Sequence, residues 1–523
     1  MAFLVLMIIL FVATLGILGF GIYKMVRVIK SPTPLLTNYV LEVKKLAFLT
    51  LSKIVAVTLG FIFLARYHGY GLNAGEWVEL IFGSALFTGG LSALIYTFFI
   101  HYYAKEIPGK LDKALFYSIL GSAFLTLIGL LLLTNAIADY IPYPLVNGIS
   151  FKEGFVTPAS GIKPNLAWYA ICILTGAILV YVICDHRFYV EYGKHGILES
   201  TFFVAFPAGI IGARIGYVIG EWNNNTNGPS FAERVAAGEW WSPFAIWEGG
   251  LTIISGALIG IIVGVLWFIW RNKKYSIWLA VDVVVPTILV AQAIGRWGNF
   301  FNCEVHGFEV LKSNWWFLPK IVANNAAFSE SNDFASLGHI WMPLFYVEFL
   351  SNMIGYFVLR FAFGKGLRKY LELGDLAFGY LVWYGLTRVI MEPLRDTNYN
   401  MGQDGYWSWL WSICFVLIGA TLIFFNHLIR YFINRKKTQF KNVNILFSSL
   451  VAGLLLAGSV ALVVIGSLNM VNGTQDTFFL QFDQFNNGLI VLVVGLALLM
   501  MFGCAVLYLV QGFTKKDNVE QKV

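Results

Sequence analysis

Apolar segments of about 20 residues recur along the whole chain and constrain its fold more than any other feature. Each is long enough to cross, as a helix, a bilayer core ~30 Å thick. Thirteen segments can be delimited, near residues 3–23, 46–65, 79–102, 113–137, 166–184, 198–220, 245–270, 276–296, 343–363, 374–393, 405–428, 445–467 and 486–511. The sequence therefore predicts an all-α polytopic membrane protein with about thirteen transmembrane helices.

The amino-acid composition also indicates a membrane protein and excludes other classes. Apolar residues make up 58% of the chain and charged residues 12%, whereas soluble globular proteins carry about 25% charged residues. These values exclude an ordinary soluble enzyme and also a disordered chain. The five cysteines form no CxxC or Cys/His pattern, so neither a metal site nor a cofactor is expected.

Basic residues cluster after every odd-numbered segment, from Lys24, Arg27 and Lys30 after the first to Lys515 and Lys516 after the last. Loops after even-numbered segments are poor in Lys and Arg. Because these residues collect on the cytoplasmic side, the N-terminus is predicted to lie outside and the C-terminus inside. The same loops account for the net charge of +7, so no nucleic-acid partner is expected.

Three ionisable residues lie near the outer end of the tenth segment, where charge is costly and needs a reason. Arg388, Glu392 and Arg395 are spaced i, i+4 and i+7, which places them on one face of a helix. The carboxylate would hold both guanidiniums in position, and a guanidinium fork suits two phosphate oxygens. The alternative is an ion-pair network that only joins helices.

A polar run at residues 295–307 ends the eighth segment and carries Arg296, Asn299, Glu304 and His306 between glycines. Glycine lets the backbone approach a ligand closely, and an Asn amide both donates and accepts hydrogen bonds. The alternative is an interfacial cap among lipid headgroups. Together with the tenth segment, this run predicts an anion site near the outer leaflet. Phosphate is the expected anion because phospholipid headgroups lie at that depth.

Glycines occupy every fourth position in parts of the sixth and seventh segments: Gly212, Gly216 and Gly220, then Gly256, Gly260 and Gly264. This spacing lets transmembrane helices pack closely, which is the favoured interpretation. Close packing does not call for an arginine, so Arg214 becomes a further candidate site residue.

Five blocks, taken in order, resemble the prolipoprotein diacylglyceryl transferase family. They are GARIGYV, WEGGLTIISGALIG, GRWGNFFNCEVHG, MPLFYVE and YGLTRVIMEPLRD. The resemblance covers residues 145–428 and implies a seven-helix transferase core there. Residues 1–144 would form an N-terminal four-span extension, and residues 429–523 a C-terminal two-span extension with a cytoplasmic tail.

The resemblance implies the reaction as well. The family moves a diacylglyceryl group from phosphatidylglycerol to the lipobox cysteine thiol of a prolipoprotein, and glycerol phosphate leaves. The implied partners are phosphatidylglycerol, the prolipoprotein lipobox segment and the lipid bilayer, in the plasma membrane of a bacterium. Carbon–oxygen cleavage with a phosphate leaving group needs positive charge where negative charge develops, which agrees with the arginines.

Roles for individual residues follow from the resemblance. Arg296 matches the arginine that holds the phosphatidylglycerol headgroup, and Arg388 matches the family's other essential arginine. The implied roles are catalytic for Arg388, Glu392, Arg395 and Glu304, lipid-binding for Arg296, Asn299, Gly307, Arg214 and Tyr169, and supporting for Asp282 and Glu348.

The chain departs from the family at the proposed base. The family usually has His before Gly-Gly, whereas this chain has Ile254 or Ser255 there, depending on the alignment; Ser255 is kept as a supporting candidate. The polar run ends in His306-Gly307 where the family has Trp-Gly. We therefore expect His306 to take over proton abstraction; the alternative is an ordinary interfacial histidine.

Two further function classes stay open from the sequence. A transporter or lipid flippase could bind an anion at the same arginines, although no paired internal repeat of the kind common in transporters is visible. A degenerate family member could bind lipid without chemistry, since the usual histidine is missing. Product formation separates both from a transferase.

Overall fold

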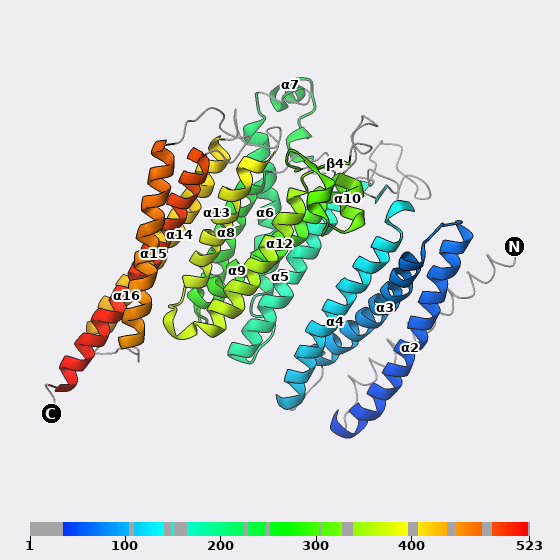
Figure 1. Ribbon diagram of the computed structural model, residues 1–523, viewed down its shortest axis with the longest axis horizontal. Helices are drawn as coiled ribbons and strands as arrows, with labels where there is room; N and C mark the ends of the chain where they lie inside the picture. Colours follow the sequence, from blue (N-terminus) through cyan, green and yellow to red (C-terminus); the bar gives the residue numbers. More distant parts are fainter. Residues whose placement is uncertain are drawn as a thin grey trace. The chain divides into compact units, whose positions relative to one another are not determined.

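The computed structural model describes residues 35–103, 109–140, 149–150, 165–166, 168–223, 229–245, 252–302, 305–326, 338–395, 406–436, 445–472 and 484–520. Long helices dominate these residues (Figure 1). Their strands are short and pair as β1 Ile149–Ser150 with β2 Asn165–Leu166, and β3 Glu309–Leu311 with β4 His339–Trp341. The prediction of an all-α polytopic membrane protein is confirmed.

The long helices follow the predicted apolar segments. They are α2 Leu35–Tyr67, α3 Ala74–Tyr103, α4 Gly109–Ala136, α5 Trp168–Tyr192, α6 Glu199–Gly220, α8 Ile253–Arg271, α9 Ile277–Asn302, α12 Leu344–Phe357 with its π-helical continuation η5 Val358–Gly366, α13 Asp375–Met391, α14 Tyr406–Lys436, α15 Ile445–Asn472 and α16 Gln484–Glu520. Within the described ranges, nine helices are long and apolar enough to cross a membrane. The predicted first segment, 3–23, lies outside those ranges, so the count of thirteen stays a prediction.

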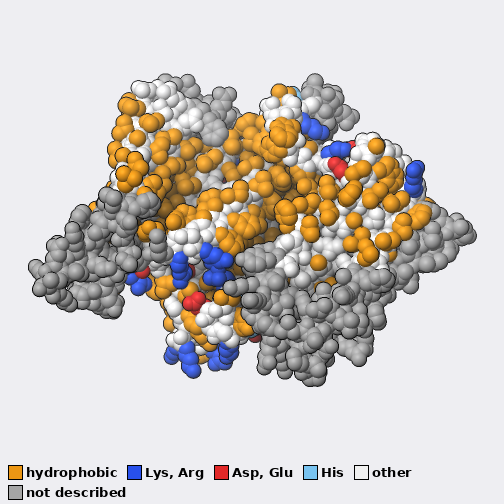
Figure 2. All heavy atoms as spheres, turned by 60° about the horizontal axis from the view of Figure 1, so that its bottom comes forward, with side chains coloured by type: hydrophobic (Ala, Val, Ile, Leu, Met, Phe, Trp, Pro, Cys, Tyr) orange, Lys and Arg blue, Asp and Glu red, His pale blue; other side chains and the backbone are white. Residues whose placement is uncertain are grey.

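Figure 2 shows the same pattern on the surface, where hydrophobic side chains cover broad areas and Lys and Arg gather in a few patches. Exposed Leu, Ile, Val and Phe along α6, α8 and α15 contribute to this apolar cover. Such a surface is costly in water and suits a lipid environment.

The chain forms two compact units, the first being Met1–Leu145 together with Val310–Ile340. In this unit α3 and α4 approach closely at Gly129, where an added Cβ would clash with the backbone nitrogen of Phe87. The inserted residues 310–340 carry α10 Lys320–Ala326. Lys320 Nζ lies 2.8 Å from Glu76 Oε1 at the start of α3.

The second unit comprises Val146–Glu309 and Trp341–Val523. Here α5 packs along α9, α12 along α9, α6 along α8 and α13 along α14. The glycine spacing serves packing, as expected: an added Cβ at Gly256 on α8 would lie 2.8 Å from the carbonyl oxygen of Gly209 on α6. This unit contains all the sequence-predicted site residues.

A buried carboxylate near the start of α9 fixes where α13 begins. Asp282 accepts hydrogen bonds from the backbone N–H groups of Gly374, at 2.7 Å, and Ala377, at 3.2 Å. Gly374 has φ +107°, which favours glycine. Asp375 beside it pairs with His427 Nε2 of α14 at 2.6 Å. These contacts set the position of α13 and therefore of Arg388 at its far end.

Candidate functional site

The buried carboxylate of Glu348 joins two arginines from different helices. Arg388 Nη1 donates to Glu348 Oε1 at 2.8 Å, and the Arg296 guanidinium forms an ion pair with Glu348 Oε2. Arg296 lies near the end of α9, Glu348 near the start of α12 and Arg388 in the last turn of α13. Three helix ends thus assemble one charged cluster.

A second buried carboxylate extends the cluster. Glu392 is 1% exposed; it forms an ion pair with Arg388 and lies 3.8 Å from Arg395 Nη1. Helix α13 ends at Met391 and the short 3-10 turn η7 Glu392–Leu394 follows. Pro393 has no N–H to continue the helix, so Arg395 reaches Glu392 from an extended backbone rather than from a third helical turn.

Backbone contacts fasten this cluster to the polar run after α9. Gly307 forms a β-bridge with Arg395, and its N–H donates to the Met342 carbonyl at 2.9 Å. An added Cβ at Gly307 would lie 2.5 Å from the carbonyl oxygen of Leu394. Only glycine allows this approach, so the close backbone contact expected of the polar run is present.

Charge is not balanced among the side chains that the structure describes here. Three guanidiniums share two carboxylates, which leaves one positive charge in excess. The buried Arg395 Nε has no hydrogen-bond partner within the described residues, and an unmet buried donor costs about 1–3 kcal/mol. An anionic acceptor would remove that cost.

Aromatic rings from α9 and α12 pack against one another next to Arg296 in the chain. Trp297, next to Arg296, lies 5.4 Å from Phe300 and 5.5 Å from Phe349, measured between ring centroids. Phe345 packs against both Trp297 and Phe300. Apolar groups beside a charged site lower the local dielectric and strengthen the attraction between opposite charges there.

Comparison with known proteins agrees with the blocks that meet in this cluster. The family model for prolipoprotein diacylglyceryl transferase matches residues 160–425, about half of the chain. The chain belongs to the prolipoprotein diacylglyceryl transferase family. This membership confirms the resemblance drawn from the five sequence blocks.

Individual relatives of this family match with similar strength. The phosphatidylglycerol–prolipoprotein diacylglyceryl transferase of Streptococcus mutans is 32% identical over 291 residues, covering 55% of this chain and 99% of the relative. The enzyme of the same name from Halalkalibacterium halodurans is 35% identical over 267 residues, 50% of this chain and 81% of the relative. That from Lactococcus lactis is 34% identical over 262 residues, 50% and 90%.

His306, the expected base, follows a strained backbone position. Val305 has φ +61°, a left-handed conformation that a β-branched residue rarely adopts. The His306 ring lies 4.8 Å from that of Trp341, and its Nδ1 lies 3.1 Å from the Gly307 carbonyl oxygen. The residue therefore sits directly beside the Gly307–Arg395 bridge; its catalytic role stays a prediction.

Two candidate residues, Arg214 and Ser255, contact backbone groups outside the Glu348 cluster. Arg214 on α6 is buried and donates to the carbonyl oxygens of Pro243, at 2.9 Å, and Ser242, at 2.8 Å. Ser255 Oγ donates to the Thr252 carbonyl at 3.0 Å and packs against Gly216. Arg214 therefore ties α6 to the 3-10 turn Ser242–Phe244, and Ser255 packs the first turn of α8 against α6. A direct role in lipid binding stays a prediction for Arg214.

The remaining candidates divide by their position. Asn299 is buried and its Oδ1 lies 3.4 Å from Arg296 Nη1, so it belongs to the cluster. Asp282 lies fourteen residues before Arg296, about 21 Å along α9, and acts through the start of α13. Glu304 lies outside the described residues, as does the side chain of Tyr169, which the structure places in the first turn of α5.

The central position of Glu348 in the charged cluster was not predicted from the sequence. The family resemblance implies only a supporting role for it, yet its carboxylate pairs with both Arg296 and Arg388. A signal was present, since Glu348 ends the MPLFYVE block and lies in an apolar segment where a carboxylate is costly. Its partners are distant in sequence, so the sequence alone did not identify them.

Proposed function

We propose that this chain transfers the diacylglyceryl group of phosphatidylglycerol to the lipobox cysteine thiol of a prolipoprotein, the first step of lipoprotein maturation. One observation carries the proposal: Arg296 and Arg388 converge on Glu348 from separate helices. Family membership supports the reaction, and the relatives that match bear the name of this activity.

In the proposed binding mode, the donor phosphate lies against Arg296 and Arg388. Glu348 and Glu392 hold the two guanidiniums before the lipid arrives. Preorganised charges stabilise a developing anion without reorganisation at the moment of reaction. Arg395, with its excess charge, adds a third donor, and Asn299 and Gly307 orient the headgroup, together with Tyr169.

The bond changes in the proposed reaction balance. The cysteine thiolate attacks the diacylglyceryl carbon that bears the phosphate oxygen, so a C–S bond forms as the C–O bond breaks. The bonding pair goes to the phosphate oxygen, and glycerol phosphate leaves. The thiol proton goes to a base, because the thiolate is the nucleophile; His306 is our candidate, with Glu304 assisting.

The wider assignments are proposals as well. The reaction would run near the outer leaflet of a bacterial plasma membrane, with the N-terminus outside and the C-terminus cytoplasmic, as the basic loops indicate. The transferase core would comprise residues 145–428, flanked by the extensions 1–144 and 429–523. Ser255 and Asp282 would hold the core helices in place, and Arg214 would contribute to binding the donor lipid.

The test mixes the purified chain with phosphatidylglycerol and a lipobox peptide, and follows peptide mass and glycerol phosphate release. We expect a diacylglyceryl mass gain that Arg296→Ala abolishes and that Arg271→Ala, an exposed arginine at the end of α8, leaves intact. A preparation that binds phosphatidylglycerol but yields no mass gain would contradict the proposal and favour a lipid carrier or flippase.

A further inference from the structure

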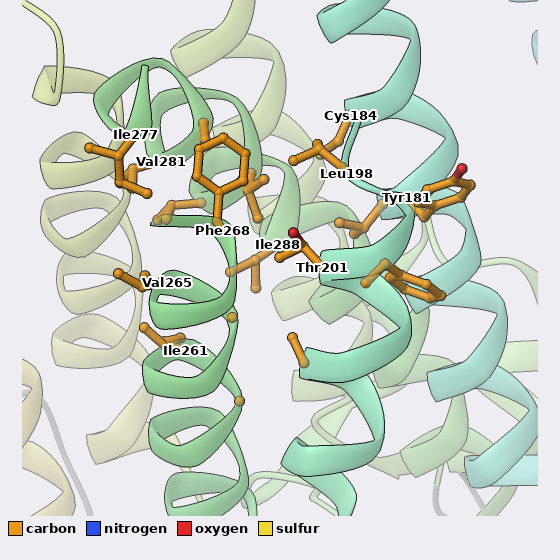
Figure 3. Close-up of a pocket in the computed structure, with 18 residues that line it drawn as sticks. Tyr181, Cys184, Leu198, Thr201, Ile261, Val265, Phe268, Ile277, Val281 and Ile288 are labelled. Carbon is orange, nitrogen blue, oxygen red and sulfur yellow. The ribbon is translucent and has the colours of Figure 1, made fainter. Parts of the chain in front are cut away.

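An apolar cavity opens between four helices of the second unit, α5, α6, α8 and α9. Its volume is about 220 Å³. Figure 3 shows the lining side chains, among them Tyr181 and Cys184 from α5, Phe268 from α8 and Val281 from α9. The Thr201 hydroxyl also lines it and has no hydrogen-bond partner within the described residues. A hydrocarbon chain fits such a lining better than water does.

The cavity lies at the other end of the core from the Glu348 cluster. Its residues on α9 fall between Ile277 and Ile288, in the first half of the helix. Arg296 follows Ile288 by eight residues, about 12 Å along the axis. The cavity is therefore a separate feature, at the level where α5 ends and α6 begins.

Three arginines gather at the same end of the unit. Arg187 on α5, Arg360 on η5 and Arg368 lie close enough to repel one another. Arg187 follows the cavity residue Cys184 by three positions, which places both on one face of α5. The charged groups thus lie nearer the helix end than the apolar cavity does, in the order of a lipid headgroup and its acyl chains.

These arginines differ from those of the Glu348 cluster in their partners. Within the described residues, none of the three forms an ion pair with a carboxylate; Glu191 attracts Arg187 only at longer range. Arg187 and Arg360 are nevertheless half-buried. Half-buried guanidiniums without counter-ions are costly, and an anion that joins them would relieve the repulsion.

The backbone that carries Arg360 is unusual. Residues Val358–Gly366 form a π-helix, a geometry that is rare and is frequently found at functional sites. Tyr356 lies one turn earlier, on α12. The guanidiniums of this cluster supply forks that suit phosphate oxygens.

We propose that this end of the core binds an anionic phospholipid, with its phosphate on Arg187, Arg360 and Arg368 and one acyl chain in the cavity. Basic pockets between transmembrane helices bind lipid headgroups in this way. An ester carbonyl of that lipid would give the Thr201 hydroxyl an acceptor. This lipid is not consumed, and the proposal does not depend on the transferase reaction.

The test titrates phosphatidic acid into the purified full chain in a neutral detergent and counts bound lipid by native mass spectrometry. The double variant Arg187→Gln/Arg360→Gln should bind one of the lipids with an affinity about tenfold lower or more. This is the loss expected when charge-assisted hydrogen bonds are removed. The matched control is Lys273→Gln/Lys274→Gln, which removes the same charge from exposed lysines in the turn between α8 and α9. An equal effect of both pairs would overturn the proposal, since it would mean diffuse surface attraction.

A second variant tests the acyl chain. Val281→Trp fills the cavity and should weaken the binding of phosphatidic acid about tenfold. The binding of inorganic phosphate to the arginines should stay as in the original chain. Unchanged lipid affinity in Val281→Trp, or complete displacement of the lipid by inorganic phosphate, would overturn the lipid assignment. Transfer from phosphatidylglycerol, assayed in the same preparations, reports on the Glu348 cluster, so failure there is distinguishable from failure here.

Discussion

Arg388 and Glu348 form a 2.8 Å ion pair although forty residues separate them in the chain. Glu348 is 5% exposed, so the pair is shielded from water and depends on good geometry. Breaking such a pair by removing one charge is strongly destabilising, typically by about 3–5 kcal/mol. The pair is therefore both a structural link between α12 and α13 and the frame of the proposed phosphate site.

Glu348→Gln should release both arginines from their shared position. We expect the KM for phosphatidylglycerol to rise about tenfold or more, because each guanidinium loses a charged partner. Initial rates over a range of donor concentrations measure the change. Glu239→Gln, which removes the half-exposed partner of Arg234, should leave KM within about twofold; equal effects of the two variants would contradict the framing role of Glu348.

Gly307→Ala should disrupt the bridge to Arg395. Its new Cβ would meet the Leu394 carbonyl oxygen at 2.5 Å, and overpacking of this kind costs about 1–3 kcal/mol. Thermal unfolding in detergent and transfer rate should both fall. Gly295→Ala is the matched control, since nothing lies within 4 Å of its added Cβ and alanine suits a helix better than glycine. A Gly307→Ala chain as stable and active as the control would refute the packing argument.

His306→Ala tests proton abstraction. If His306 accepts the thiol proton, its removal should slow transfer by a factor of about 10²–10⁴, the usual contribution of a general base. The comparison is a pH–rate profile at saturating phosphatidylglycerol. His68→Ala, in the first unit and exposed, serves as the control. A variant that keeps the full rate at every pH would remove His306 from the mechanism.

Lys320→Met should loosen the inserted segment from the N-terminal helices. Lys320 donates a hydrogen bond to the Glu76 carboxylate, and this bond raises the pKa of Lys320 above its usual value. The pair therefore stabilises the fold at neutral pH, and this contribution is lost as pH rises through the raised pKa. The lysine is 42% exposed, so the effect is below about 1 kcal/mol.

Hydrogen exchange over residues 320–326 measures this loosening, and exchange should quicken in Lys320→Met. The exposed Lys312 gives the control, Lys312→Met. Equal protection in the variant and the original chain would show that the ion pair contributes nothing to the insertion.

Local regularities made much of the fold predictable. Apolar length located every described long helix, and glycine spacing anticipated the approach of α6 to α8. Arg388 and Glu392, spaced i and i+4, form an ion pair as the spacing predicts. Arg395 departs from the helical expectation because the α-helix ends at Met391, just before Pro393.

Long-range contacts were less predictable from the sequence. Nothing in the spacing of Arg296 and Glu348 indicates that α9 and α12 bring them together, since helix packing decides it. Likewise, residues 310–340 lie between two blocks of the transferase signature, yet they fold with the first unit. The partner of Lys320, at the start of α3, is some 240 residues away and has no local signal.

The carboxylate that Arg296 and Arg388 share also affects which anions the site can bind. Before any donor arrives, Glu348 and Glu392 already occupy faces of the arginines, so the site carries its own counter-ions at a high effective concentration. Inorganic phosphate from the surroundings must compete with them and brings no hydrophobic gain in return. The phosphate of a diacyl phospholipid is held by the bilayer at the depth of the site. The membrane therefore contributes to the selectivity of the site for lipid phosphate.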